Sequence, residues 1–203
     1  AVADQIQIAV IGVRGMGGGH VRRLLERSDV RIAALCDIDQ QVLAAAQKAV
    51  HDATGQKPQG FEQFQRVLDD DSIDAVVVAT PHHWHAPIGV RALQAGKDLY
   101  LEKPGSHVFR EGRLLVEAAD KYDRVFQHGT QMRSSQVTAR AGEVLASGIL
   151  GTVRMSKAWN CQRHTHRKPV PDGSCPSHVN YDLWLGPAPL RPFNQNRFHG
   201  NWN

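Results

Sequence analysis

Short apolar runs alternate with amphipathic segments through the first 130 residues of the chain. The apolar, β-branched runs predict strands at residues 5–11, 30–36, 75–79, 99–101 and 125–127. Apolar residues at helical spacing predict helices at residues 20–27, 40–53, 61–68, 86–95 and 111–121. Strands that alternate with helices in this way predict an α/β fold, a doubly wound parallel sheet of the Rossmann type.

The pattern changes after residue 130. Residues 136–148 predict a helix and residues 152–159 alternate as a strand, whereas residues 160–203 are rich in proline and lack enough periodic apolar structure to form a domain. Trp184, Phe193 and Trp202 need a surface that covers them. We therefore expect a Rossmann domain over residues 1–130 and the start of an incomplete α/β substrate domain over residues 131–203.

A glycine-rich turn joins the first predicted strand to the first predicted helix. Its sequence from Gly12 to His20 is GVRGMGGGH, and such a turn lets backbone N–H groups approach a pyrophosphate at a helix N-terminus. Gly12 and Gly17 fit the first and third places of the usual motif with Arg14 in the second, whereas a register that starts at Gly15 puts His20 in the third place. Both registers stay open. The predicted cofactor residues of the turn are Gly12, Arg14, Gly15, Met16 and Gly17.

Asp37 ends the second predicted strand, about 20 residues past the turn. A carboxylate at this place accepts hydrogen bonds from both hydroxyls of an adenosine ribose and repels a 2′-phosphate. We therefore predict NAD as the cofactor and favour it over NADP. The alternative is that Asp37 caps the following helix, for which Asp39 is the competing candidate.

Basic residues gather where two further strands end. His82, His83 and His85 follow the 75–79 strand, and Lys103 follows the 99–101 strand, at the sheet edge where α/β proteins bind ligands. A lysine there stabilises the alkoxide that develops as hydride leaves a carbinol and relays its proton, which makes Lys103 the predicted catalytic and substrate-binding residue. The alternative is a lysine that only bonds carbonyls near Pro104, after a peptide bond that is a candidate for the cis form. Adjacent histidines lack the usual ligand geometry, so we predict no metal site.

The segments Ala79–Ala86 (ATPHHWHA) and Ala95–Pro104 (AGKDLYLEKP) resemble the signature of the Gfo/Idh/MocA oxidoreductases. The resemblance covers residues 5 to about 160, and Glu-Lys-Pro is its most specific part. Residues 161–203 are similar to a bacterial subgroup of mostly unassigned substrate. The resemblance implies a Rossmann domain followed by an α/β domain whose open sheet covers the nicotinamide and often builds an oligomer. It also implies hydride transfer between NAD(P) and a sugar or polyol hydroxyl.

The same resemblance implies roles for individual residues. Lys103 would lie beside the nicotinamide and the reacting hydroxyl, and Glu102 against the nicotinamide ribose. The positions that match cofactor or substrate contacts of the family are Thr80, Pro81, His82, His85, Gln131 and Arg133. Many members have Asn or Asp in place of His82, which leaves that contact in doubt, and a hinge role for the segment with Gln131 and Arg133 stays open.

The second catalytic element of the family, an aspartate and a histidine on a helix of the second domain, would lie beyond Asn203. We therefore expect this chain to bind NAD without carrying all of the catalytic machinery of a sugar or polyol dehydrogenase. Two alternatives stay open. One is a non-catalytic NAD-binding or regulatory protein, and the other is a redox-assisted glycosidase in which NAD is not consumed.

The charge and composition of the chain limit the classes of partner that we expect. The net charge is +4 and the pI about 9.2, but the basic residues are dispersed without interleaved aromatic residues, which argues against nucleic acid. No window approaches the roughly 18 apolar residues that a membrane helix needs. Three cysteines without a CxxC pair favour a reducing, cytoplasmic location, although a removed export leader stays open because the chain starts at Ala1. The expected partners are a small sugar or polyol and, in the full-length form, further copies of the chain.

Overall fold

The computed structural model describes residues 5–159 and 168–198, which form two compact units. The first unit holds the described residues up to Gly129 together with those from Asp172 onward, and the second runs from Thr130 to Pro171. The chain therefore leaves the first unit and returns to it. The predicted domain boundary at residue 130 stays a prediction.

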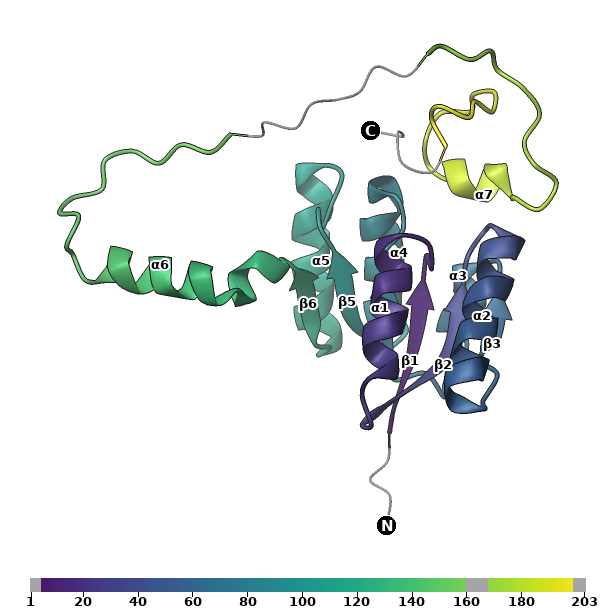
Figure 1. The fold of residues 1–203 in the computed structure, drawn as a ribbon, viewed down its shortest axis with the longest axis horizontal. Helices are drawn as coiled ribbons and strands as arrows, with labels where there is room; N and C mark the ends of the chain where they lie inside the picture. Colours follow the sequence, from purple (N-terminus) through teal and green to yellow (C-terminus); the bar gives the residue numbers. More distant parts are fainter. Residues whose placement is uncertain (1–4, 160–167, 199–203) are drawn as a thin grey trace. The chain divides into compact units, whose positions relative to one another are not determined.

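The first unit is built on a sheet of six parallel strands in the order β3-β2-β1-β4-β5-β6 (Figure 1). The strands are β1 (Ile6–Ile11), β2 (Val30–Cys36), β3 (Gln59–Phe61), β4 (Ala75–Val78), β5 (Asp98–Glu102) and β6 (Phe126–Gly129). This order confirms the predicted doubly wound sheet. Because it reverses direction between β1 and β4, a crevice opens there at the carboxyl ends of the strands.

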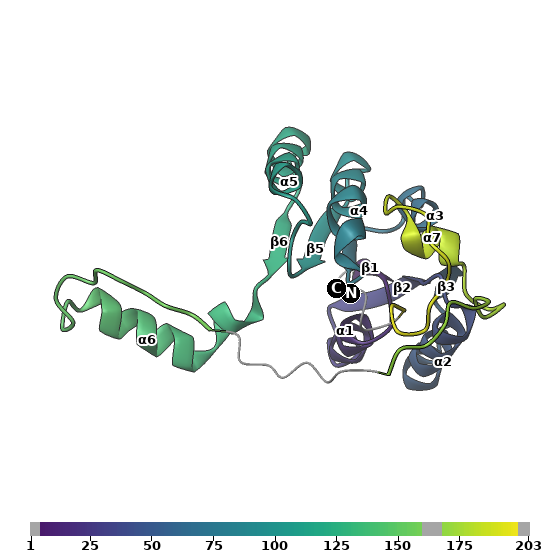
Figure 2. The ribbon, with the colours of Figure 1, turned by 90° about the horizontal axis from the view of Figure 1, so that it is seen from above.

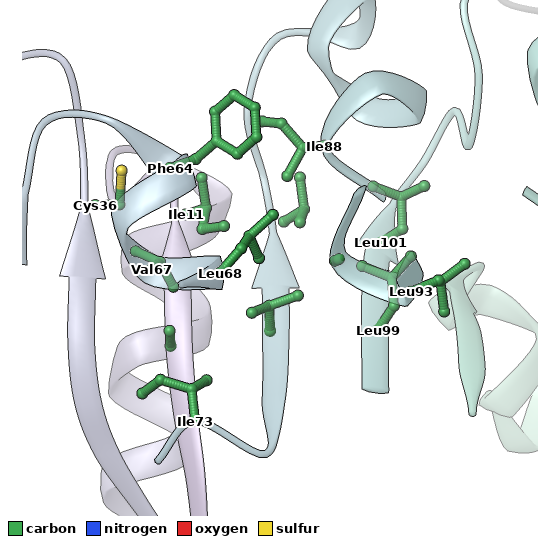
Figure 3. Close-up of a cluster of buried hydrophobic side chains, with 14 of the residues drawn as sticks. Ile11, Cys36, Phe64, Val67, Leu68, Ile73, Ile88, Leu93, Leu99 and Leu101 are labelled. Atoms are coloured by element: carbon green, nitrogen blue, oxygen red, sulfur yellow. The ribbon is translucent and has the colours of Figure 1, made fainter. Parts of the chain in front are cut away.

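Helices cover both faces of the sheet, as the view from above shows (Figure 2). One face carries α1 (Met16–Leu25) and α2 (Gln40–Thr54), and the other carries α3 (Phe64–Leu68), α4 (His82–Gln94) and α5 (Phe109–Tyr122). Side chains of β1 alternate between the two cores, with Ile8 and Val10 on the α1/α2 side and Ala9 and Ile11 on the other. Figure 3 shows side chains of that second core from strands, α3 and α4 together with Ile73, and α5 adds Leu115 and Ala118 to the same core.

Two predicted elements of the sequence are wrong. Residues 61–68 do not form one helix, because Phe61 pairs with Cys36 in the edge strand β3 and α3 begins only at Phe64. The predicted strand at residues 152–159 is absent from the second unit, where the described residues contain no other strand that would pair with it. The second unit does contain the predicted helix, α6 (Gln136–Ala146), after a 3-10 helix, η1 (Gln131–Ser134).

The proline-rich tail is more ordered than its composition indicates. It forms a short helix, α7 (Tyr181–Leu185), inside an apolar cluster of Val179, Trp184, Leu185, Phe193 and Phe198. Trp184 and Phe193 are both 8% exposed, so other side chains cover them, as their size predicted. Trp202 lies outside the described residues. No helix within the described ranges is long and apolar enough to cross a membrane.

Candidate functional site

A cavity of about 300 Å³ lies at the carboxyl edge of the sheet, in the first unit. The residues around it follow β1, β2, β3 and β4 and belong to α3, α4 and α7. Its walls are mostly apolar, and the charged side chains among its lining are Arg14, Asp37 and Glu62. An apolar cavity with a few convergent polar groups at the reversal of strand order is the usual form of a nucleotide site in this architecture.

The glycine turn forms one end of this cavity. Gly12 has a φ of +81°, and a Cβ there would lie 2.9 Å from the Ala79 carbonyl carbon and oxygen. A Cβ on Gly17 would overlap the Gly12 carbonyl oxygen. Both places therefore require glycine, which favours the register with Gly12 first, Arg14 second and Gly17 third. Gly15, with a φ of +52°, precedes the first residue of α1 and leaves the backbone of the turn open to a ligand.

Asp37 is held at the end of β2 by two backbone N–H groups. Its Oδ2 accepts from Val13 N at 2.9 Å and its Oδ1 from Asp39 N at 3.0 Å. Burial raises the pKa of Asp37, and these two hydrogen bonds oppose the rise. Asp39 accepts from Gln41 N at 3.0 Å and Val42 N at 3.2 Å, so Asp39 caps α2 and the alternative that assigned the cap to Asp37 is wrong. Each Asp37 oxygen keeps a lone pair for a ligand hydroxyl.

A contact that the sequence did not predict fixes the Glu-Lys-Pro segment. His20 Nε2 lies 2.8 Å from Glu102 Oε1, and the His20 ring packs edge-on against Tyr100. The other oxygen of Glu102 accepts from the backbone N of Lys103 at 3.1 Å. The Lys103–Pro104 peptide bond is cis. The Lys103 side chain is exposed, and no carbonyl in the described parts of the chain accepts a hydrogen bond from its ammonium, which leaves the carbonyl-bonding alternative without support.

His85 connects the loop that follows β4 to the loop that follows β5. It is 1% exposed, its Nδ1 lies 2.6 Å from the Pro104 carbonyl oxygen and its Nε2 lies 2.8 Å from the Thr80 carbonyl oxygen. Burial lowers the pKa of His85, and the contacts of its two nitrogens with the Pro104 and Thr80 carbonyl oxygens oppose this effect. His85 thus holds the segment after β4 next to the segment after Lys103, and it does not line the cavity.

The other two histidines of this segment also lie in the first turn of α4. Burial, together with the nearby positive charges of His85 and Lys103, lowers the pKa of His82 to about 4. Burial also lowers the pKa of His83, whose Nε2 lies 2.9 Å from the Trp184 carbonyl oxygen. Among residues 5–159 and 168–198, no group of three or more His, Cys, Asp or Glu side chains has an arrangement that suits a metal ion.

The structure brings together only part of the predicted cofactor set. The predicted residues that line the cavity are Gly12, Arg14, Gly15, Asp37, Thr80 and Pro81. The remaining predicted residues of the first unit, which lie outside its lining, are Met16, Gly17, His82, His85, Glu102 and Lys103. Gln131 and Arg133 belong to η1 of the second unit, so their roles stay predictions.

Sequence reasoning missed the residues that make the cavity apolar. They include Phe64, Trp84, Ile88, Leu183 and Trp184. The polar side chains of Glu62, Gln63 and Gln65, which also line the cavity, were missed as well. Of these residues, only Trp84 could have been predicted from its position, because it lies among the residues that follow a strand of the sheet. Nothing in the local pattern of residues 181–187 connected them to the site.

Comparison with known proteins agrees with this architecture. The model of an oxidoreductase family with an NAD-binding Rossmann fold matches residues 6–130. The model of a C-terminal α/β domain of an oxidoreductase family matches residues 141–203. A curated relative is "Glycosyl hydrolase family 109 protein 2" from Shewanella sp. (strain ANA-3), with 35% identity over 125 residues, which are 60% of this chain and 27% of that protein.

Solved structures show the same fold. GenD2 from gentamicin A biosynthesis, in complex with NAD, is 28% identical with a TM-score of 0.64 over 73% of this chain and 41% of that one. Scyllo-inositol dehydrogenase from Lactobacillus casei, with bound NAD(H) and scyllo-inositol, is 22% identical with a TM-score of 0.66 over 73% of this chain and 43% of that one. The chain thus spans less than half the length of these proteins.

Proposed function

Because the chain belongs to the oxidoreductase family with an NAD-binding Rossmann fold, we propose that it binds NAD and serves hydride transfer to or from a hydroxyl of a sugar or polyol. One observation carries the proposal. The turn at Gly12 and Gly15 and the carboxylate of Asp37 line a single cavity where the strand order reverses. Gly12 and Gly15 leave the backbone of the turn open to a pyrophosphate, and Arg14 adds a positive charge to the same lining. Asp37 keeps acceptor capacity for a ribose diol, so these residues fit the cofactor.

In this proposal the backbone N–H groups of the turn hold the phosphates, and Asp37 holds the adenosine ribose. Because a second anion beside the Asp37 carboxylate is repelled, NAD is preferred over NADP. When bound, NAD supplies the hydride acceptor. The Lys103 ammonium would donate a hydrogen bond to the developing alkoxide and relay its proton, releasing one of its own protons to solvent as it receives that of the hydroxyl. The pair of His20 and Glu102 positions the Lys103 backbone.

Calorimetric titration of NAD and NADP tests the cofactor site. We expect NAD to bind at least about tenfold more tightly than NADP. Asp37→Ala should weaken NAD binding by about 10- to 100-fold, because a hydrogen bond to a charged acceptor contributes about 1.5–3 kcal/mol. The control is Asp71→Ala, which removes an exposed carboxylate from a turn outside the cavity. Equal affinity of the wild-type and Asp37→Ala chains for NAD would refute the ribose assignment.

The catalytic part is tested by NADH formation with a panel of sugars and polyols. Lys103→Ala should lower the rate at least about 100-fold, the range of general acid–base catalysis, and leave the affinity for NAD within about threefold. Lys57→Ala, on the exposed segment before β3, is the control. A rate within about tenfold of wild type for Lys103→Ala would remove Lys103 from the mechanism.

A second candidate is a redox-assisted glycosidase, which the name of the Shewanella relative favours. Its products distinguish it from a dehydrogenase. A glycosidase of this kind releases sugar from a glycoside without net NADH, whereas a dehydrogenase accumulates NADH in proportion to product. A protein that binds NAD and does neither would be the non-catalytic alternative.

A further inference from the structure

Residues 178–186, which we call the α7 strap, bridge two strand ends of the cavity. At one end the strap pairs with the loop that follows β2. Gln40 N donates to the His178 carbonyl oxygen at 2.9 Å, and Asn180 N donates to the Ile38 carbonyl oxygen at 2.9 Å. This loop directly follows Asp37, so the strap is tied to the segment that would hold the adenosine ribose.

At its other end the strap is tied to the start of α4. Trp84 Nε1 donates to the Leu183 carbonyl oxygen at 2.9 Å, and His83 Nε2 lies 2.9 Å from the Trp184 carbonyl oxygen. Gly186 has a φ of +52°, and any Cβ there would overlap the Trp84 ring. The backbone of the strap at Gly186 therefore lies directly against α4, with no room for a side chain between them. Side chains of α4 also form hydrogen bonds with two backbone carbonyls of α7.

The strap gives the cavity an aromatic wall. Leu183 and Trp184 line the cavity opposite residues of the sheet edge, next to Phe64 and Trp84. Phe64 and Trp84 meet edge-on with centroids 5.5 Å apart, and Trp184 stacks on Tyr181 at 5.6 Å. Indole and phenyl faces of this kind suit a flat aromatic ligand.

Two buried polar atoms of cavity-lining residues have no hydrogen-bond partner within residues 5–159 and 168–198. They are Gln65 Oε1 and Thr80 Oγ1, both buried, and both residues line the cavity. A buried polar atom without a partner is costly to the protein. Because these atoms are closed off from solvent, the Gln65 amide must turn toward the cavity to meet a ligand. The edge of an amino-substituted purine carries both donors and acceptors, so it then satisfies either orientation of the amide.

We propose that the α7 strap is the outer wall of the adenine subsite, so that residues from the second matched region of the chain complete the cofactor site and retain the cofactor. The inference rests on the proposed function. With the phosphates on the glycine turn and the ribose on Asp37, the aromatic slot under the strap is the part of the cavity that remains for the base. His83 acts on binding through the strap, as a positioning residue. Trp84 lines the cavity and also holds the strap through its hydrogen bond to Leu183.

The test is titration of the chain with ADP and with NAD, combined with stopped-flow release of NADH. ADP carries only the adenosine end, so Trp184→Ala should weaken ADP and NAD by the same factor, about tenfold or more. Trp84→Phe keeps a ring but removes the donor to Leu183, and should speed NADH release at least about threefold. Trp159→Ala, which removes a 77% exposed indole from the second unit, should change neither.

The outcomes separate the two proposals. If the wild-type chain binds neither ADP nor NAD, the proposed function and the strap proposal both fail. If the wild-type chain binds both, and Trp184→Ala binds them within about twofold of wild type, only the strap proposal fails. Should Trp184→Ala not fold, Trp84→Phe decides, because unchanged NADH release in that variant contradicts the positioning role.

Discussion

His85→Ala should destabilise the first unit although His85 lies outside the lining of the cavity. The ring is 1% exposed and its nitrogens lie 2.6 and 2.8 Å from the Pro104 and Thr80 carbonyl oxygens. The variant loses a hydrogen bond to a part-buried carbonyl, which costs about 1–3 kcal/mol. It also leaves a void where a fully buried ring was, which costs about 2 kcal/mol or more. We expect the free energy of unfolding to fall by about 3–5 kcal/mol.

Urea unfolding followed by circular dichroism measures this change, with an unchanged dependence on urea as the check that the unfolded state is the same. His107→Ala is the matched control, because that histidine is exposed, and it should change the free energy by less than about 0.5 kcal/mol. His85→Gln keeps one donor and should recover part of the loss. A loss below about 1 kcal/mol for His85→Ala would refute the view that this ring ties the two loops together.

Three further predictions concern stability. The pKa of His82 is about 4 in the folded chain and about 6.5 in an unfolded one. The contribution of His82 to stability should therefore be complete above about pH 6.5 and fall as the pH decreases toward 4. Urea titrations at several pH values should show a smaller dependence of stability on pH for His82→Asn than for the wild-type chain. Gly17→Ala should lower the free energy of unfolding by at least about 3 kcal/mol in thermal or urea unfolding, because the added Cβ would overlap a carbonyl oxygen. Gly19→Ala in the same helix is the control: its Cβ would lie 3.5 Å from the nearest atom, so this variant should be as stable as the wild type or more stable. Asp39→Ala should cost about 1–2 kcal/mol by loss of the α2 cap, and an unchanged midpoint of unfolding would contradict that role.

The sheet and its helices were predictable because their signals are local. The alternation of β1 and the glycine turn after it need only neighbouring residues, and Asp37 follows from its distance to that turn. Where the pattern was short, it misled. The three-residue strand β3 forms because it pairs with β2, and nothing in residues 59–61 alone indicates that pairing.

The rest of the site depends on contacts between distant residues. His20 and Glu102 are separated by 82 positions, and Trp84 and Leu183 by 99. A single sequence contains no signal that pairs such residues, so His20 was considered only as an imperfect glycine position, and the aromatic wall was missed. The need of Trp184 for a cover was correctly predicted from its size, but which surface covers it was not.

The return of the chain to its first unit at Asp172 has a consequence for biosynthesis. A ribosome adds roughly 5–20 residues per second, so the six strands are complete several seconds before the cluster of Val179, Trp184 and Phe198 emerges. During that interval the surface that this cluster later covers is open to solvent and to chaperones. The same discontinuity limits recombination, because a gene fusion that exchanges everything after residue 130 also exchanges one wall of the cavity.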